Sequence, residues 1–325
     1  MQGWSLEHKI QVSQTRIIEW YQKWDGKAYV SFSGGKDSTV LVDLSARVCK
    51  NLGYKLVLWY SDTGLEYPEV KKHVKSFKQY LINKYNIEVE LVIDFPKDKN
   101  GKRVLFKDVI LDKGYPVISK EVSEDVNIAR NNPDSRAMQK FIRGSDYHKK
   151  YGDRWLLEKY SYLIDAPFKI SKQCCNIMKK NPSYKFQKET GLHLITGSMA
   201  SESNLRKNEW RMHGCNFFDA KRPVSNPLSF WTEQDVLHYL VKFEIPYASV
   251  YGEILTNEKG KYYTTGLSRT GCFPCMYGVH LEKEPNRFQR LKVTHPKLWE
   301  YCMKPCSQGG LGEKEVLEYI GVKTE

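Results

Sequence analysis

The fold is decided by one stretch of sequence, YVSFSGGKDSTVL, at residues 29–41. Its opening residues 29–32 are β-branched and aromatic, which predicts a buried strand. From Asp37 onward the apolar side chains recur at helical spacing, which predicts a helix. The glycines Gly34 and Gly35 therefore lie on a turn that joins a strand to a helix.

Such a turn is a ready anion site, because the first N–H groups of a helix lack intrahelical partners and the helix dipole is positive there. Gly34 and Gly35 let the backbone approach a phosphate closely, and Lys36 adds a point charge. The hydroxyls of Ser33 and Ser38 can donate hydrogen bonds. The alternative is a glycine turn that only connects two elements. The spacing differs from the G-x-x-x-x-G-K-[ST] of a Walker A loop, which argues against an ordinary kinase or GTPase.

Residues 33–38, SGGKDS, resemble the PP-loop of the ATP pyrophosphatases. Members of that group grip the pyrophosphate of ATP and leave its α-phosphorus open to attack. The resemblance implies catalytic roles for Lys36, Asp37 and Arg206, with ATP and Mg²⁺ as cofactors. The nucleotide-binding residues that we expect are Ser31, Ser33, Gly34, Gly35, Lys36, Asp37, Ser38, Asp62, Thr63, Gly64, Gly197 and Arg269.

The composition bounds the class of protein. The chain has 325 residues, with 51 Lys and Arg against 38 Asp and Glu, giving a net charge of +13. Such a surplus favours a polyanionic partner such as nucleic acid, although a solvated basic surface on a nucleotide-binding enzyme would also explain it. No run reaches the roughly 18 apolar residues of a membrane helix. We therefore expect a cytoplasmic protein whose eight cysteines stay reduced.

The order of predicted elements indicates an α/β fold. An amphipathic helix over 6–24 precedes the decisive stretch, and strands are expected over 56–60, 88–93 and 192–196. We expect a doubly wound, mostly parallel sheet of the Rossmann-like, adenine nucleotide alpha hydrolase type, with a helical C-terminal region. We expect a nucleotide-binding α/β domain over 1–215, which contains a charged helical insertion at about 96–165, and a C-terminal region over 216–325 that carries Cys272 and Cys275 and packs on the same domain.

Two turns follow predicted strands. The turn DTGLE at 62–66 lies at the carboxyl end of a strand, where ligands gather in open α/β sheets. The alternative is that Asp62 or Glu66 caps the helix that begins near Pro68. The second turn, at 197–206, has an acid and an arginine placed to meet a ligand.

The insertion mixes basic and aromatic residues. Such a pattern predicts either a surface that follows a phosphate backbone and stacks bases, or a solvated helical hairpin. The sequence leaves the two readings open. The residues concerned are Arg130, Arg136, Lys140, Phe141, Arg143, Tyr147, Lys149, Lys150, Tyr151, Arg154 and Trp155.

Four cysteines form a candidate metal site. Cys174 and Cys175 are adjacent, and Cys272 and Cys275 form C-x-x-C. Four thiolates can hold zinc or a [4Fe–4S] cluster, and reduced buried thiols are the alternative. The C-C pair followed by basic residues and proline, with a distant R-T-G-C-x-x-C, resembles the cluster motif of adenylyl-sulfate reductases and Dnd-type DNA phosphorothioation enzymes. Both belong to the phosphoadenosine phosphosulfate (PAPS) reductase family within the PP-loop group. The resemblance implies that these four cysteines bind a [4Fe–4S] cluster.

Three functions remain in competition at this stage. The first is adenylation of a substrate, DNA or RNA, for iron–sulfur-assisted sulfur transfer, with a cysteine desulfurase as the sulfur donor. The second is an adenylyl-sulfate or phosphoadenylyl-sulfate reductase that releases sulfite with thioredoxin. The E-C-G-[LI]-H tail of such reductases is absent, but Cys302 or Cys306 could replace its cysteine. The third is a non-catalytic sensor of nucleotide or redox state. The sequence also leaves open whether the chain forms a homodimer.

Overall fold

A computed structural model describes all residues 1–325, which divide into two compact units. The sheet unit consists of residues 1–62, 66–94 and 182–271, and the cysteine unit consists of 63–65, 95–181 and 272–325. The domain boundary expected between residues 215 and 216 falls inside the sheet unit. The expected insertion at about 96–165 lies within the cysteine unit.

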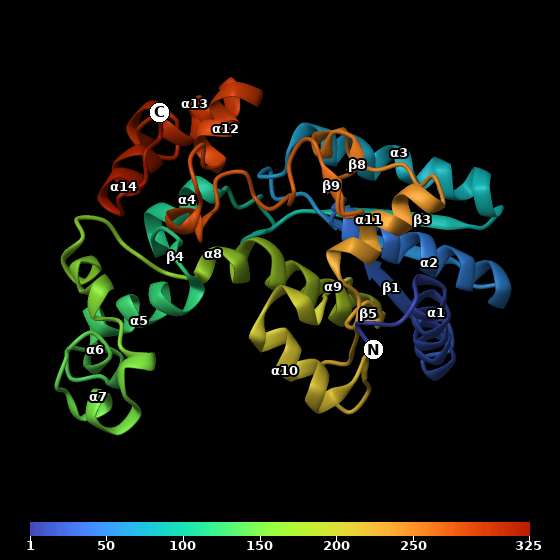
Figure 1. The fold of residues 1–325 in the computed structure, drawn as a ribbon, viewed down its shortest axis with the longest axis horizontal. Helices are drawn as coiled ribbons and strands as arrows, with labels where there is room; N and C mark the ends of the chain where they lie inside the picture. Colours follow the sequence, from blue (N-terminus) through green and yellow to red (C-terminus); the bar gives the residue numbers. More distant parts are fainter. The chain divides into compact units, whose positions relative to one another are not determined.

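The sheet unit has the predicted order of strands and helices (Figure 1). Its strands are β1 (Ala28–Ser31), β2 (Leu56–Ser61), β3 (Val89–Asp94), β5 (His193–Ile195), β6 (Asn216–Phe217), β7 (Val224–Ser225), β8 (Ile254–Thr256) and β9 (Tyr262–Thr264). Its helices are α1 (Leu6–Lys23), α2 (Lys36–Leu52), α3 (Pro68–Tyr85), α9 (Asn181–Thr190), α10 (Asn204–His213) and α11 (Glu233–Lys242).

The main sheet has six strands in the order β3-β2-β1-β5-β7-β6. All neighbouring pairs are parallel except β6 with β7. Strand β1 pairs with β2 on one side and β5 on the other, so the strand order reverses at β1. Ligands of open α/β sheets bind at such a switch point, outside the carboxyl ends of the strands. The topology confirms the predicted doubly wound, mostly parallel sheet.

Both faces of the sheet are buried, because successive side chains of a strand point to opposite faces. Ala28 and Val30 of β1 belong to the large core together with residues of α1, α2, α3 and α11. Tyr29 of β1 belongs instead to a second core, where it packs with Phe186 of α9. Helices thus cover both faces, which explains why the central strands β1 and β2 are largely apolar.

The cysteine unit is mainly helical. Its helices are α4 (Phe106–Lys113), α5 (Lys120–Asn131), α6 (Arg136–Gln139), α7 (Asp146–Tyr151), α8 (Gln173–Cys175), α12 (Arg287–Thr294), α13 (Pro296–Met303) and α14 (Glu313–Tyr319). Its two strands, β4 (Val117–Ile118) and β10 (Met276–Tyr277), pair in parallel. None of the helices in the whole chain is both long enough and apolar enough to cross a membrane.

One part of the expected helical insertion is extended rather than helical. Gly114 has φ +108°, and a Cβ there would lie 2.4 Å from the carbonyl carbon of Lys169. The backbone of Tyr115 then bonds with the strand-like segment at Lys169 and Ser171. The close approach of two backbones requires glycine at 114, and it ends α4 where the sequence predicted only a break in a helix.

Candidate active site

The glycine turn follows β1 and begins α2 as predicted. Gly34 has φ +74°, and a Cβ there would lie 2.6 Å from Cγ2 of Val74 and 2.8 Å from Cγ1 of Val70. Gly35 is the N-cap of α2 and has no side chain to cap the helix. The turn therefore requires glycine at 34 for two reasons, backbone conformation and space, and it leaves the first N–H groups of α2 to other partners.

A tyrosine hydroxyl occupies the helix N-terminus. The backbone N–H of Lys36 donates to the hydroxyl of Tyr251, 3.1 Å away. That hydroxyl also bonds with Oγ1 of Thr270 at 2.7 Å. A Cβ on Gly35 would lie 3.3 Å from the Thr270 hydroxyl, so both hydroxyls sit directly over the turn. Sequence reasoning assigned no role to these two residues, because they are more than 200 positions away from the glycines.

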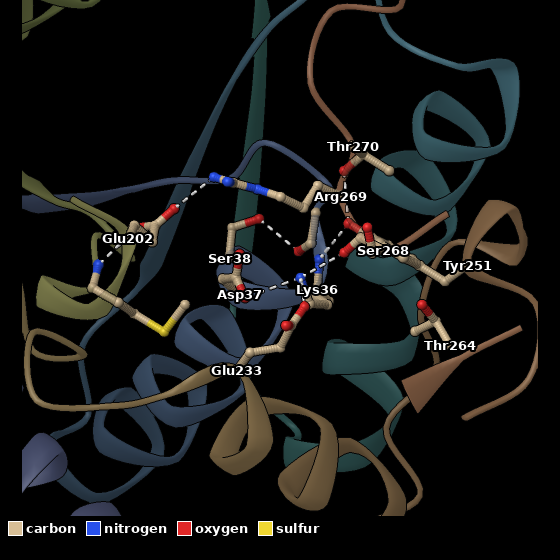
Figure 2. Close-up of polar contacts among 12 residues, drawn as sticks. Lys36, Asp37, Ser38, Glu202, Glu233, Tyr251, Thr264, Ser268, Arg269 and Thr270 are labelled. Atoms are coloured by element: carbon tan, nitrogen blue, oxygen red, sulfur yellow. Dashed lines mark hydrogen bonds and ion pairs between the residues drawn. The ribbon is translucent and has the colours of Figure 1, made fainter. Parts of the chain in front are cut away.

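The Lys36 ammonium is almost buried, with 5% of its side chain exposed. It donates to the backbone carbonyl of Ser268 at 2.9 Å and pairs with Oε1 of Glu233 at 3.1 Å (Figure 2). Oδ1 of Asp37 lies 3.7 Å away. Glu233 is the first residue of α11, and no sequence pattern predicted it at this turn. The predicted cation is thus fixed at the start of α2 by groups that a phosphate can replace.

Asp37 lies in an environment that opposes its charge. Burial raises the pKa of its carboxyl above the ordinary value, and the Lys36 ammonium partly offsets this rise. Its Oδ1 is buried and accepts no hydrogen bond. Asp37 and Glu233 flank the same ammonium, so two carboxylates lie beside the turn. Mg²⁺ in nucleotide sites is bound by one or two carboxylates together with phosphate oxygens, and this donor set fits it.

Two arginines meet at one carboxylate. Arg206 forms an ion pair with Glu202, and Nη2 of Arg269 lies 3.3 Å from the other carboxylate oxygen of Glu202. The backbone N–H of Met199 also donates to Glu202, at 3.0 Å. Both arginines lower the pKa of Asp37, so they lie within electrostatic reach of the turn. Glu202 is the acid that the sequence indicated in the turn at 197–206.

The hydroxyls of the turn bond mainly with the turn itself. Ser33 and Ser38 bond to each other at 3.0 Å, and both Ser38 and Thr39 donate to the carbonyl of Gly35. Thr39 also bonds with Nε2 of His73 at 3.0 Å, and burial lowers the pKa of His73 to about 4. The Gly35 carbonyl also accepts the first intrahelical bond of α2, from the N–H of Thr39 at 2.9 Å, and the N–H of Gly35 donates to Oγ of Ser33 at 3.4 Å.

Other predicted residues are placed as follows. Ser31 ends β1 and pairs in register with Trp59, and Gly197 lies against the turn, since a Cβ there would be 3.4 Å from the Asp37 carbonyl oxygen. Asp62 is 7% exposed and pairs with Lys71 at 2.6 Å.

The turn after β2 is divided between the units, because Asp62 belongs to the sheet unit while Thr63 and Gly64 belong to the cysteine unit. The Thr63 hydroxyl accepts from the N–H of Leu65 at 3.2 Å. Helix α3 begins after Tyr67, whose own side chain makes no capping hydrogen bond.

The four candidate ligand cysteines all belong to the cysteine unit. Cys174 and Cys175 are on α8, and the backbone N–H of Cys275 donates to the Cys272 carbonyl at 3.1 Å. A hydrogen bond with Cys175, burial and the neighbouring Cys275 and Cys272 thiols all raise the pKa of Cys174. The pKa of Cys175 falls to about 6, first through the bond with Cys174 and then through nearby lysines. The four thiols therefore share one neighbourhood.

The side chains nevertheless do not form a closed ligand set. No group of three or more His, Cys, Asp or Glu side chains is arranged to hold a metal ion. The expected convergence of four sulfurs on one cluster is therefore not seen. The donor chemistry fits a cluster, because soft thiolates are its usual ligands. The arrangement requires the thiols to move closer together when a cluster is loaded.

The remaining cysteines have other environments. Cys302 is fully buried, and burial together with the Glu313 carboxyl raises the pKa of its thiol. Cys306 is half-buried, with its sulfur 3.7 Å from the hydroxyl of Tyr115. Cys49 and Cys215 are buried in the main core, as expected for packing residues. A buried thiol of raised pKa is a poor nucleophile, which counts against Cys302 as a reactive residue.

The basic and aromatic residues of the insertion divide into two groups. Arg130 donates to the carbonyls of Ile164 and Phe168, and Lys140 pairs with Asp125 at 2.7 Å. Phe141 and Tyr147 are buried. A second group stays on the surface and consists of Arg136, Arg143, Lys149, Lys150, Tyr151, Arg154 and Trp155. The first group is held by contacts within the unit, so the two alternatives of a nucleic-acid surface and a solvated hairpin concern the second group.

The fold and the site together define an α/β protein whose glycine turn, of the kind that suits an anion, lies at the switch point of the sheet. Residues 27–110 and 118–277 match the model of the phosphoadenosine phosphosulfate reductase domain, and the chain belongs to this family. The predicted resemblance is thereby confirmed. No curated protein sequence matches the chain.

Two solved structures show distant similarity. NMN synthetase from Francisella tularensis has 11% identity and a TM-score of 0.34, over 75% of this chain and 72% of that chain. The U34-tRNA thiolase NcsA from Methanococcus maripaludis, solved with its [4Fe-4S] cluster, has 15% identity and a TM-score of 0.38. That match covers 98% of this chain and 83% of the other.

Proposed function

We propose that the protein is an ATP pyrophosphatase that adenylates an acceptor and thereby prepares it for sulfur transfer. One observation carries the proposal. The N-terminus of α2 has no side-chain cap, and an almost buried ammonium, that of Lys36, is held beside it by a carbonyl and a carboxylate. An anion with several phosphates satisfies both features at once.

Binding of ATP would replace contacts that the site now makes internally. The β- and γ-phosphates would accept from the N–H groups of Gly34, Gly35 and Lys36. The hydroxyl of Tyr251 would give up the Lys36 N–H, and the ammonium would exchange Glu233 for a phosphate oxygen. Each exchange substitutes a charged acceptor for a neutral or shared one, which strengthens the hydrogen bond.

The chemical step is a displacement at the α-phosphorus. An oxygen of the acceptor forms a bond to that phosphorus, and the bond to the bridging oxygen breaks with its electron pair leaving on pyrophosphate. The N–H groups and Lys36 stabilise the charge that grows on the leaving group. Arg206 and Arg269, released from Glu202, would bind the α-phosphate. Catalysis here is mainly positioning and charge stabilisation, and no general base is required.

Two absent cofactors have residues that suit them. Asp37 and Glu233 would hold Mg²⁺, which supplies a positive charge that offsets the phosphates. Cys174, Cys175, Cys272 and Cys275 would hold the [4Fe–4S] cluster, which would supply a site that binds sulfide.

Sulfur transfer would complete the reaction. A hydrosulfide ion forms a carbon–sulfur bond on the activated acceptor, and AMP leaves with the acceptor oxygen. A cysteine desulfurase with a thiol reductant would supply the hydrosulfide. The acceptor that the net charge of +13 favours is nucleic acid, through attraction to its phosphates.

The test follows pyrophosphate and AMP. Protein reconstituted anaerobically with iron and sulfide is incubated with ATP and Mg²⁺, with and without mixed RNA or DNA. We expect nucleic acid to stimulate pyrophosphate release, and Lys36→Ala to reduce the rate by about 100-fold or more. Sulfite released from an adenylyl sulfate in the presence of thioredoxin, without pyrophosphate, would replace the proposal with the reductase. ATP binding without turnover under any acceptor would favour the sensor.

A further inference from the structure

The surface group of the insertion contains aromatic rings that carry cations over their faces. Tyr151 is 40% exposed and Trp155 is 45% exposed. The Arg136 guanidinium lies 4.9 Å from the centre of the Tyr151 ring, and the Lys150 ammonium lies 5.4 Å from it. The Arg154 guanidinium lies 5.5 Å from the centre of the Trp155 ring. We name these five residues the aromatic–basic face.

The cations of this face are electrostatically available. Residues 136–159 contain seven Lys and Arg but only three Asp and Glu. Cations outside the face engage all three carboxylates, since Arg143 pairs with two of them and Lys149 with the third. The three cations of the face form no ion pair. The face therefore offers its positive charge to an external anion.

Packing holds the face in place. The Tyr151 ring lies 4.7 Å from the ring of Tyr147, centre to centre, and Tyr147 is buried. Arg136 also lies over Tyr147, with its guanidinium 5.0 Å from the ring centre. The exposed tyrosine and its cation are thus supported from below by a core residue, which reduces the entropy lost when a ligand binds.

We propose that the aromatic–basic face binds single-stranded RNA. Exposed aromatic rings stack on unpaired bases, and adjacent Lys and Arg contact the phosphates of the same strand. Duplex nucleic acid hides its bases inside the stack, whereas RNA displays unpaired bases in loops and ends. The proposed function supplies only the reason why RNA would be recruited, and to that extent the inference rests on it. Binding of RNA at this face requires neither ATP nor a cluster.

The first experiment measures affinity by fluorescence anisotropy, using the full chain and a labelled, mixed-sequence, single-stranded RNA oligonucleotide. We expect Trp155→Leu and Tyr151→Leu each to weaken binding by roughly 5- to 150-fold, the range observed for loss of one base-stacking aromatic. The matched control is Tyr263→Leu. Tyr263 is 44% exposed on β9, with no cation over its ring, and its substitution should leave the affinity unchanged.

A second measurement uses charge instead of stacking. The logarithm of the binding constant falls with the logarithm of salt concentration, by about 0.7 for each phosphate contact on a single strand. The double variant Lys150→Ala/Arg154→Ala should flatten the slope by roughly two contacts. Lys149→Ala removes one charge, from an ammonium that already pairs with Asp146, and should flatten the slope by less than one contact.

The proposal is overturned if both aromatic variants bind RNA as tightly as the unmodified protein. It is also overturned if duplex RNA, duplex DNA or single-stranded DNA binds as tightly as single-stranded RNA. The proposed function fails separately. If RNA stimulates pyrophosphate release by the Trp155→Leu variant as strongly as by the unmodified protein, only the RNA-binding role of the aromatic–basic face is refuted. If the two aromatic variants lose RNA binding but the unmodified protein releases no pyrophosphate under any condition, only the proposed adenylation is refuted.

Discussion

The glycine turn of the sheet unit and the four cysteines of the cysteine unit are prepared to different degrees. At the turn, every charged group has a partner, and the Lys36 ammonium is already fixed beside the helix N-terminus. The four thiols influence one another, yet no three side chains are arranged around a metal position. The Lys36 ammonium of the turn is therefore held in position without a ligand. The four thiols are neighbours of one another but do not surround a metal position.

The difference has a physical cause. The turn is built from backbone N–H groups whose directions are set by β1, α2 and one left-handed glycine, so the fold itself determines it. A thiol site gains its final arrangement from bonds to the metal, and metal binding is coupled to local folding. Backbone-built anion sites should therefore tolerate loss of the ligand better than thiol sites do.

The largest effect that we expect comes from Lys36→Ala. Pyrophosphate release should fall by about 100-fold or more, because the charge that stabilises the leaving group is lost. Bound iron should stay unchanged, because Lys36 lies in the other unit from the cysteines. Lys55→Ala removes an exposed lysine that pairs with Glu90, and it serves as the control. A loss of only a few-fold would mean that the turn is structural.

The second effect is on the cysteine unit. Cys174→Ser should remove most of the iron and the visible absorbance of the reconstituted protein, because a hydroxyl is a poor ligand for the cluster. ATP binding, measured by calorimetry, should persist. Cys215→Ser, in a cysteine of the main core, should leave the iron content unchanged. Equal iron in both variants would contradict the assignment of the ligands.

A third substitution tests whether the turn is set by the backbone. Gly34→Ala should destabilise the protein by about 2–4 kcal/mol in urea unfolding, through a positive φ and a Cβ that overlaps Val74. Gly53 has φ +73° with nothing within 4 Å, so Gly53→Ala should cost only the conformational part, about 1 kcal/mol. Equal losses would show that the close approach to α3 does not matter.

The smallest effect concerns a buried acid of the cysteine unit. Glu313 is fully buried, neither carboxylate oxygen accepts a hydrogen bond, and burial raises its pKa well above 4.5. The folded protein therefore keeps a proton that the unfolded chain loses above about pH 4.5, so stability falls as the pH rises.

The slope from this one proton is at most about 1.4 kcal/mol per pH unit. Glu313→Gln should remove it, as followed by the free energy of unfolding between pH 5 and 8. The exposed Glu315 on the same helix provides the control Glu315→Gln, which should keep the slope. If the free energy of unfolding of Glu313→Gln depends on pH as it does in the unmodified protein, the proton responsible is bound by another group.

Much of the fold could be predicted from the sequence because its signals are local. The strand at 29–32, the glycine turn and the helix after it are encoded in thirteen consecutive residues. The start of α11 also depends on a local signal, a capping box in which Thr232 accepts from the N–H of Asp235 and the Asp235 carboxylate accepts from the N–H of Thr232. The candidate ligand cysteines could be named from the sequence, because thiolates are the usual ligands of such clusters and the chain has only eight cysteines.

Partners that come from distant residues could not be predicted. The glycine turn is reached by Glu233 at the start of α11, by Tyr251 between α11 and β8, and by Thr270 in the loop after β9. No local pattern linked Glu233 or Tyr251 to a site, and the motif that contains Thr270 did not link it to the glycine turn. The two-unit division is likewise a property of long-range contacts, so the boundary expected at 215/216 followed chain order rather than packing.

The sequence by itself determined the backbone of the glycine turn, because glycine conformation and helix initiation depend on neighbouring residues. Only the tertiary structure decided which charges remain available. Arg143 and Arg154 look alike in the sequence, but the first is paired with two carboxylates while the second lies over an exposed ring. Ion pairing depends on which side chains the packing brings within about 4 Å, and that distance is not written in the spacing of residues along the chain.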